Sequence, residues 1–199
     1  MFRAYVDGSY NKDIDTTAYG VVVIDENKNV LAKYNGIIND SMLTAMHQIG
    51  GEIIAATVAT RLAYLAGERE VEIFYDYKGI YHWAKLHKPW NSNRRGTIGY
   101  QDFMHYMQKD KGIKIKFNKV HGSHSNRKEA FGETDIDIDP LNDIVDEVVK
   151  AAFDKVSMLK CRENKESISD IKSKLVGMEI FDIDTIDEEI VFDEVENEK

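Results

Sequence analysis

The chain has 199 residues, 43% of them hydrophobic, and a formal net charge of −9. This length and apolar content predict one domain with a buried core, and the single cysteine, Cys161, excludes an internal disulfide and is typical of a reducing compartment. No apolar stretch approaches the ~20 residues that a membrane helix needs, so we expect a cytoplasmic protein that does not bind a membrane.

The negative charge is concentrated towards the C-terminus. Residues 161–199 contain 13 acidic and 5 basic residues, whereas residues 1–160 contain 22 acidic and 21 basic residues. The first 160 residues are therefore nearly neutral. We predict a folded domain over residues 1–160 and an acidic tail over residues 161–199.

Apolar periodicity and turn residues predict nine elements along the chain. They are strands at residues 2–7, 18–24 and 30–38, a helix at 42–66, a strand at 70–76, helices at 78–87 and 98–109, a strand at 113–120 and a helix at 141–158. A run of strands followed by alternating helices and strands indicates an α/β fold with a mixed five-stranded sheet flanked by helices.

Two of the predicted strands end in an acidic residue. In the first strand the alternation of apolar and polar residues stops at Asp7, which a glycine follows. The β-branched and aromatic run at residues 71–75 likewise ends at Asp76. If these strands are neighbours, both carboxylates lie at one edge of the sheet.

Two further acidic residues lie on predicted helices. Steps of three and four residues from Glu52 reach only alanines, at positions 56, 59 and 63, so this face can approach the sheet closely. Asp146 borders an apolar helical stripe over residues 145–153. We expect all four carboxylates to point into one cleft.

Clustered carboxylates repel one another, and a divalent cation compensates that repulsion. Oxygen ligands without cysteine or paired histidines favour Mg²⁺ or Mn²⁺ over zinc. Two such ions about 4 Å apart can support phosphodiester hydrolysis. The alternative interpretation is that each acid is merely a turn residue or a helix cap.

Several segments, in this order and spacing, resemble ribonucleases H of the type 1 class, and most closely the bacterial branch found beside a viroplasmin-like domain. They are residues 5–12 (YVDGSYNK), 19–24 (YGVVVI), 46–52 (MHQIGGE), 75–80 (YDYKGI) with Trp83 and Ala84, 96–100 (GTIGY) with Phe103, 117–120 (FNKV) and 142–147 (NDIVDE). The resemblance covers residues 2 to about 158 and implies the same fold that the periodicity predicts.

The resemblance implies a function as well. Asp7, Glu52, Asp76 and Asp146 would hold two Mg²⁺ ions, with Mn²⁺ as an alternative. The protein would then be an endonuclease that hydrolyses the RNA strand of an RNA/DNA hybrid and leaves 5′-phosphate and 3′-hydroxyl ends.

Members of this family also carry a histidine on a loop before the last acid. Here that loop contains two candidates, and the spacing from residues 117–120 together with the following serine favours His124. Strand parity counted through Phe117 favours His121 instead, so both stay open.

The resemblance also implies which residues bind the two strands of the hybrid. Gly8, Ser9 and Gln48 occupy positions that contact the ribose 2′-hydroxyls of the RNA strand, although Gln48 replaces the more usual asparagine. Trp90, Asn93 and Thr97 match positions that bind the DNA strand. The basic residues around Trp90 support a phosphate track.

Two other functions remain open at this point. One is a different nuclease of the ribonuclease H-like superfamily, and the other is a hybrid-binding module without catalysis. The Gly-Gly-Glu start of the predicted helix argues against a different nuclease. The presence of all four acids argues against a module that only binds the hybrid.

Two segments depart from the family pattern. Residues 127–141 form an acidic insertion, which can be a solvated loop or contact the surroundings of the substrate. Residues 161–199 can be disordered, add a strand, bind a protein partner or cover the basic substrate surface.

Overall fold

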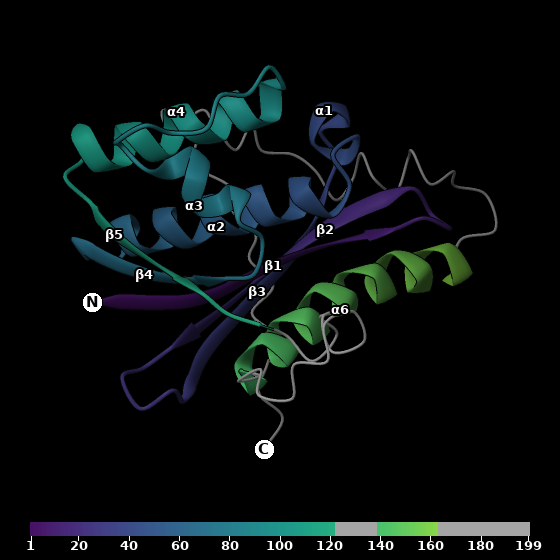
Figure 1. Ribbon diagram of the computed structural model, residues 1–199. Coiled ribbons are helices and arrows are strands. Elements are labelled where there is room, and N and C mark those ends of the chain that lie inside the picture. The colour runs from purple at the N-terminus through teal and green to yellow at the C-terminus, as the bar shows by residue number, and fades with distance from the viewer. Residues whose placement is uncertain (122–138, 163–199) are drawn as a thin grey trace, which may run out of the picture.

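The computed structural model describes the backbone of residues 1–121 and 139–162. The predicted class is confirmed, because helices flank a mixed five-stranded sheet (Figure 1). In chain order the elements are β1 (Phe2–Asn11), β2 (Thr16–Ile24), β3 (Val30–Ile38), α1 (Ser41–Thr44), α2 (Gln48–Leu65), β4 (Glu70–Tyr75), α3 (Gly79–Ala84), α4 (Arg95–Lys109), β5 (Lys114–Lys119) and α6 (Pro140–Arg162).

The sheet has the strand order β3-β2-β1-β4-β5. Strands β1, β2 and β3 form an antiparallel meander, whereas β4 pairs in parallel with both β1 and β5. Parallel pairs need crossover connections, and helices provide them on both sides of β4. The strands carrying Asp7 and preceding Asp76 are therefore neighbours, as the sequence predicts.

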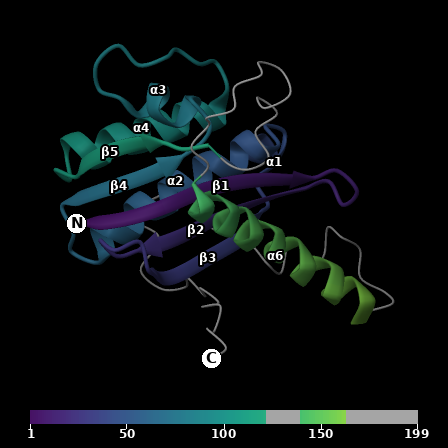
Figure 2. The same cartoon turned by 60° about the horizontal axis from the view of Figure 1, so that its bottom comes forward.

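Helices cover both faces of the sheet. Helices α2, α3 and α4 lie on one face and α6 lies on the other, crossing β1, β2 and β3 (Figures 1 and 2). The larger core lies under α2, whose Ala56, Ala59 and Ala63 are fully buried against the sheet. A smaller core lies under α6, where Val145 and Val149 are fully buried.

The prediction that Asp7 ends its strand is wrong. β1 continues to Asn11, because it stays paired with β2 as far as the Asn11–Thr16 pair. Its pairing with β4 stops earlier, at Tyr5 and Phe74. Asp7 therefore lies within β1 at the point where β4 has already ended.

The predicted helix over residues 42–66 is two helices. Asp40 caps α1 by accepting hydrogen bonds from the amides of Met42 and Leu43, and α1 then ends at Thr44. The chain turns at His47, whose φ of 53° lies in the left-handed region, before α2 begins. The remaining elements agree with the sequence prediction to within a few residues.

No helix in the described ranges combines the length and the apolar character needed to cross a bilayer. Helix α6 continues to Arg162. The division into a catalytic domain and an acidic tail at residue 161 stays a prediction, because residues 163–199 lie outside the described residues.

Candidate active site

Three of the four predicted carboxylates meet where β1 separates from β4. Asp7 comes from the middle of β1, Glu52 from the first turns of α2 and Asp76 from the residue after β4. One ligand oxygen from each lies within 4.8 Å of the others. This spacing is close enough for the three oxygens to share a cation.

Two glycines bring Glu52 to this position. A Cβ atom on Gly8 would lie 2.2 Å from the amide nitrogen of Glu52, and a Cβ atom on Gly51 would lie 2.3 Å from the carbonyl oxygen of Ala18. The backbone of α2 therefore rests directly on β1 and β2. Any larger side chain at either glycine would push Glu52 away from Asp7.

The fourth carboxylate, Asp146, approaches from the opposite face of the sheet. Gly20 pairs with Asp7 across β1 and β2, and a Cβ atom there would lie 2.6 Å from Val149 of α6. This contact brings α6 close to the strand that carries Asp7. Asp146 accepts a hydrogen bond from Lys150 and, although it is not part of the group of three, its charge acts on Asp7.

The carboxylates perturb one another strongly. Burial, followed by repulsion from Asp76 and then Asp146, raises the pKa of Asp7 to about 7, although the Gly8 amide donates to its Oδ1 at 2.8 Å. Burial and the charges of Asp76 and Asp7 raise the pKa of Glu52 well above its ordinary value. Simultaneous ionisation of Asp7 and Glu52 is therefore unfavourable in the metal-free protein.

Glu52 supplies a direct test of whether this site fits a metal ion. Its side chain is buried, and its Oε2 atom has no hydrogen-bond partner among the described residues. A buried carboxylate oxygen without a partner is costly, and a cation supplies the missing interaction. All the available ligand atoms are carboxylate oxygens, the donors that Mg²⁺ and Mn²⁺ prefer.

Of the two candidate histidines, the structure describes His121 but not His124. His121 follows the end of β5, is half-buried, and accepts a hydrogen bond from the Asp139 amide through its carbonyl oxygen. His124 lies outside the described residues, as do residues 127–138 of the predicted insertion. The choice between the two histidines therefore stays a prediction.

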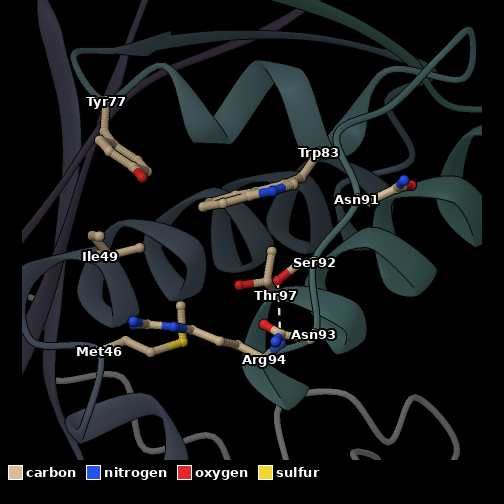
Figure 3. A pocket seen from close by; sticks show the side chains of 9 residues that line it. All are labelled: Met46, Ile49, Tyr77, Trp83, Asn91, Ser92, Asn93, Arg94 and Thr97. Atoms are coloured by element: carbon tan, nitrogen blue, oxygen red, sulfur yellow. Dashed lines mark hydrogen bonds between the residues drawn. The ribbon is translucent and has the colours of Figure 1, made fainter.

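A cavity of about 580 Å³ lies between α2, α3 and the start of α4, and Tyr77, the residue after Asp76, lines it (Figure 3). Thr97 and Asn93 line it. The Thr97 side chain is 1% exposed, and its hydroxyl has no hydrogen-bond partner within the described part of the chain. This hydroxyl is available to a ligand in the cavity.

Trp90 lies outside the cavity lining but next to it. Its ring stacks on His82 at 4.2 Å between centroids and meets the edge of Trp83 at 6.2 Å. Since 43% of Trp90 stays exposed, one face of the ring is available to a partner. Trp83 is buried and also lines the cavity.

The three residues predicted to contact RNA surround the start of α2. Gly8 is buried beneath the helix, and its amide already donates to Asp7. Ser9 is half-buried in β1, and Gln48 is exposed as the first residue of α2. Solvent therefore reaches the side chains of Ser9 and Gln48, which lie near the carboxylates.

The sequence analysis missed part of the cavity lining. Met46, Ile49, Tyr77 and Arg94 line it together with Thr97 and Trp83 (Figure 3). Arg94 was noted only as one of several basic residues near Trp90. Tyr77 and Ile49 directly follow Asp76 and Gln48 in the sequence, and this adjacency was the available signal.

The strand order, the helices on both faces and the carboxylates at the β1–β4 junction together define a ribonuclease H-like α/β fold. Solved structures of RNase H1 proteins share this fold. The RNase H1 of the halophilic archaeon Halobacterium salinarum is similar with a TM-score of 0.57 and 15% identity, covering 77% of this chain and 98% of that chain.

Two further structures give the same result. The N-terminal RNase H domain of a Mycobacterium tuberculosis protein, solved as a fusion with maltose-binding protein, is 14% identical with a TM-score of 0.56, covering 79% of this chain and 98% of that one. LC11-RNase H1 from a compost metagenome, solved in complex with an RNA/DNA hybrid, is 17% identical with a TM-score of 0.57, covering 78% of this chain and 98% of its own.

No protein-family model matches the chain, and no curated protein matches its sequence. The likeness to RNase H1 therefore concerns the fold. Activity has to be argued from the residues of this chain.

Proposed function

We propose that the protein is a metal-dependent endonuclease that hydrolyses the RNA strand of RNA/DNA hybrids and leaves 5′-phosphate and 3′-hydroxyl ends. One observation carries this proposal. Glu52 is a buried carboxylate with an unpaired oxygen, and it lies within 4.8 Å of oxygens from Asp7 and Asp76. Such an arrangement is unfavourable unless a cation occupies it.

In this proposal Asp7, Glu52, Asp76 and Asp146 hold two Mg²⁺ ions, with Mn²⁺ as an alternative. When bound, two such ions activate water for in-line attack on phosphorus and stabilise the leaving 3′ oxygen. Lys150 donates a hydrogen bond to Asp146, and its charge favours the ionised form of Asp7. Deprotonated carboxylates are the form that binds metal.

Selection of RNA requires contacts to the 2′-hydroxyl, since that group locally distinguishes RNA from DNA. We assign these contacts to the hydroxyl of Ser9, the amide side chain of Gln48 and the backbone at Gly8. The absence of a side chain at Gly8 also keeps α2 close to β1, so the RNA strand would meet the helix start and the strand together.

We assign the DNA strand to the surface formed by Trp90, Asn93 and Thr97. The unpaired hydroxyl of Thr97 and the side chain of Arg94 lie in one cavity, and both suit a phosphate group. The exposed ring of Trp90 suits contact with a sugar or base. An RNase H1 of this fold has been solved with an RNA/DNA hybrid, which supports the assignment.

Three finer assignments belong to the same proposal. The chain would belong to the type 1 class and to the branch found beside viroplasmin-like domains, as the order and spacing of its matching segments suggest. His124, or alternatively His121, would assist the attacking water or product departure. The acidic residues 161–199 would form a separate tail that binds a protein partner.

The decisive experiment is a gel assay with labelled RNA/DNA hybrid in Mg²⁺, in Mn²⁺ and in EDTA. We expect cleavage of the RNA strand with either metal and none in EDTA. Duplex DNA and branched DNA serve as competing substrates and should stay intact. Preferential cleavage of branched DNA would instead identify another nuclease of this fold.

A matched pair of variants separates catalysis from binding. Asp76→Asn should abolish cleavage while the protein still binds the hybrid. Glu70→Gln changes an exposed acid at the start of β4 that pairs with Lys114, and it should leave cleavage unchanged. Unaltered biological activity of Asp76→Asn would identify a binding module without catalysis.

A further inference from the structure

Asp139 joins three parts of the molecule immediately before α6. Its Oδ1 atom accepts a hydrogen bond from the amide of Leu141 at 3.1 Å, so it caps the helix. Its Oδ2 atom accepts one from the hydroxyl of Tyr5 at 2.6 Å and lies 3.5 Å from the ammonium group of Lys28. The two carboxylate oxygens therefore have different partners.

Tyr5 is a rigid partner for this contact. Its side chain is fully buried, and its ring stacks on Phe74 of the neighbouring strand with centroids 4.4 Å apart and planes 6° from parallel. Burial and the hydrogen bond to Asp139 raise the pKa of the Tyr5 hydroxyl, so it remains a donor. Strand β1 thus holds one end of α6 through a short bond in the interior.

The same two elements carry half of the candidate metal centre. Tyr5 and Asp7 are two residues apart on β1 and therefore lie on one face of the strand. Asp139 and Asp146 are seven residues apart, which is close to two helical turns and about 10 Å along α6. The Tyr5–Asp139 bond and the Asp7–Asp146 approach are thus two links between the same strand and the same helix.

Asp146 needs such a link more than the other three acids do. Asp7, Glu52 and Asp76 are held by the sheet and by the glycine contacts of α2. The apolar contacts of α6, such as Val149 on Gly20, set its distance from the sheet, but dispersion contacts are not directional. Two hydrogen bonds add directional restraint: Asn35 of β3 donates to the carbonyl oxygen of Val148 at 2.7 Å, and Tyr5 donates to Asp139 at 2.6 Å. The second bond joins α6 to β1, the strand that carries Asp7.

We propose that Asp139, through its hydrogen bond with Tyr5, is a positioning residue that places Asp146 at the metal centre. This inference rests on the proposed function, because it assumes that Asp146 is a metal ligand. Removing the Tyr5 hydroxyl should weaken metal binding through Asp146 while leaving the helix cap at Leu141 intact. Residues that orient a metal ligand without contacting the metal typically change metal affinity 10- to 100-fold when they are mutated.

The test measures Mg²⁺ binding to the full chain by isothermal titration calorimetry, without substrate. Tyr5→Phe should lower the Mg²⁺ affinity of the lower-affinity site about tenfold. Tyr10→Phe is the matched control, since it removes another tyrosine–aspartate hydrogen bond of β1, the exposed 2.7 Å bond to Asp15. It should bind Mg²⁺ as the parent protein does.

A double variant shows whether Tyr5 acts through Asp146. Adding Tyr5→Phe to Asp146→Asn should cause no further loss, because the residue that Tyr5 positions has already been changed. A further tenfold loss in the double variant would overturn the inference. So would equal Mg²⁺ binding by the parent protein and Tyr5→Phe.

A second pair of variants keeps the test valid if Tyr5→Phe folds poorly. Asp139→Asn retains a helix cap and a polar partner for Tyr5, whereas Asp139→Ala removes both. We expect Asp139→Asn to bind Mg²⁺ about as the parent does and Asp139→Ala to bind it more weakly; equal affinities would overturn the inference. Absence of Mg²⁺ binding by the parent protein would overturn the proposed function itself, and this inference with it.

Discussion

Two glutamates of this protein, Glu52 and Glu72, are equally well buried, with 4% and 6% of their surfaces exposed, and yet have opposite electrostatic surroundings. Glu72 lies in the middle of β4 and accepts hydrogen bonds from Arg3, Lys116 and Asn118 of the neighbouring strands. Burial alone would raise its pKa, but these three partners together lower it. Glu72 is fully compensated by the protein.

Glu52 has two acids as its nearest charged neighbours, and its pKa is raised. The difference shows that the fold can neutralise a buried carboxylate when the strands supply cations, and that it does not do so at the β1–β4 junction. Buried charge without compensation is what distinguishes a candidate metal centre from a structural ion-pair network.

The largest expected effect comes from Glu52→Gln. We expect the rate of hybrid cleavage to fall about 10³-fold or more, as on loss of a principal catalytic group. The melting temperature in EDTA should stay the same or rise, because the variant removes a buried carboxyl group whose ionised form Asp76 and Asp7 repel. A lower melting temperature in EDTA would mean that Glu52 stabilises the fold, and the contrast with Glu72 would fail.

Glu72→Gln should have the opposite pattern. The variant weakens three charge-assisted hydrogen bonds and should lower the free energy of unfolding by about 1–3 kcal/mol. Cleavage activity below the melting temperature should be unchanged. Urea denaturation and steady-state kinetics measure the two quantities, and a selective loss of activity would contradict this prediction.

The pH dependence of stability should separate the two regions. Asp7 ionises at its ordinary pKa of 3.8 in the unfolded chain and at about 7 in the metal-free folded protein. Between these values the folded state retains a proton that the unfolded state has lost, so the stability contribution present at low pH is lost as pH rises. Melting temperatures in EDTA should show this loss, and Mg²⁺ should reduce it.

The lowered pKa of Glu72 has the reverse sign. Its contribution is present above the ordinary pKa of 4.5 and is lost as pH falls below it. Asp7→Asn should therefore flatten the profile between 3.8 and about 7, whereas Glu72→Gln should flatten only its acidic end. Identical profiles for both variants would contradict the assignment.

The smallest effect is expected on the predicted DNA-strand surface. Trp90→Ala should weaken hybrid binding by about 1 kcal/mol, or roughly fivefold in KM, with little change in kcat. Leu86→Ala is a matched control, since Leu86 is an exposed apolar residue of the same loop at 45% exposure. A similar rise in KM for both variants would indicate loss of general packing.

Most of the fold was predictable, because the apolar patterns were strong. The alanine face of α2 and the apolar stripe of α6 are buried as expected. The break between α1 and α2 was missed because residues 45–49 contain no glycine or proline, so the turn at His47 depends on its contacts and its strained φ. The extension of β1 was missed because only β2 supports it there.

The candidate site was predictable only in part. Acidic residues at the ends of elements were visible as a pattern, and three of them do meet. The cavity lined by Tyr77, Trp83 and Arg94 was not visible as a unit, because its members come from three separate segments. The bond between Tyr5 and Asp139 joins residues 134 positions apart, and nothing in local sequence indicates it.

The sequence by itself determined which segments form strands and helices and which residues can bind a metal, because these depend on local periodicity and side-chain chemistry. Only the tertiary structure decided that, within the described ranges, Glu72 pairs with Arg3 and Lys116 whereas no cationic side chain pairs with Glu52. Compensation of a buried charge depends on which strands become neighbours, and that pairing is a property of the whole chain.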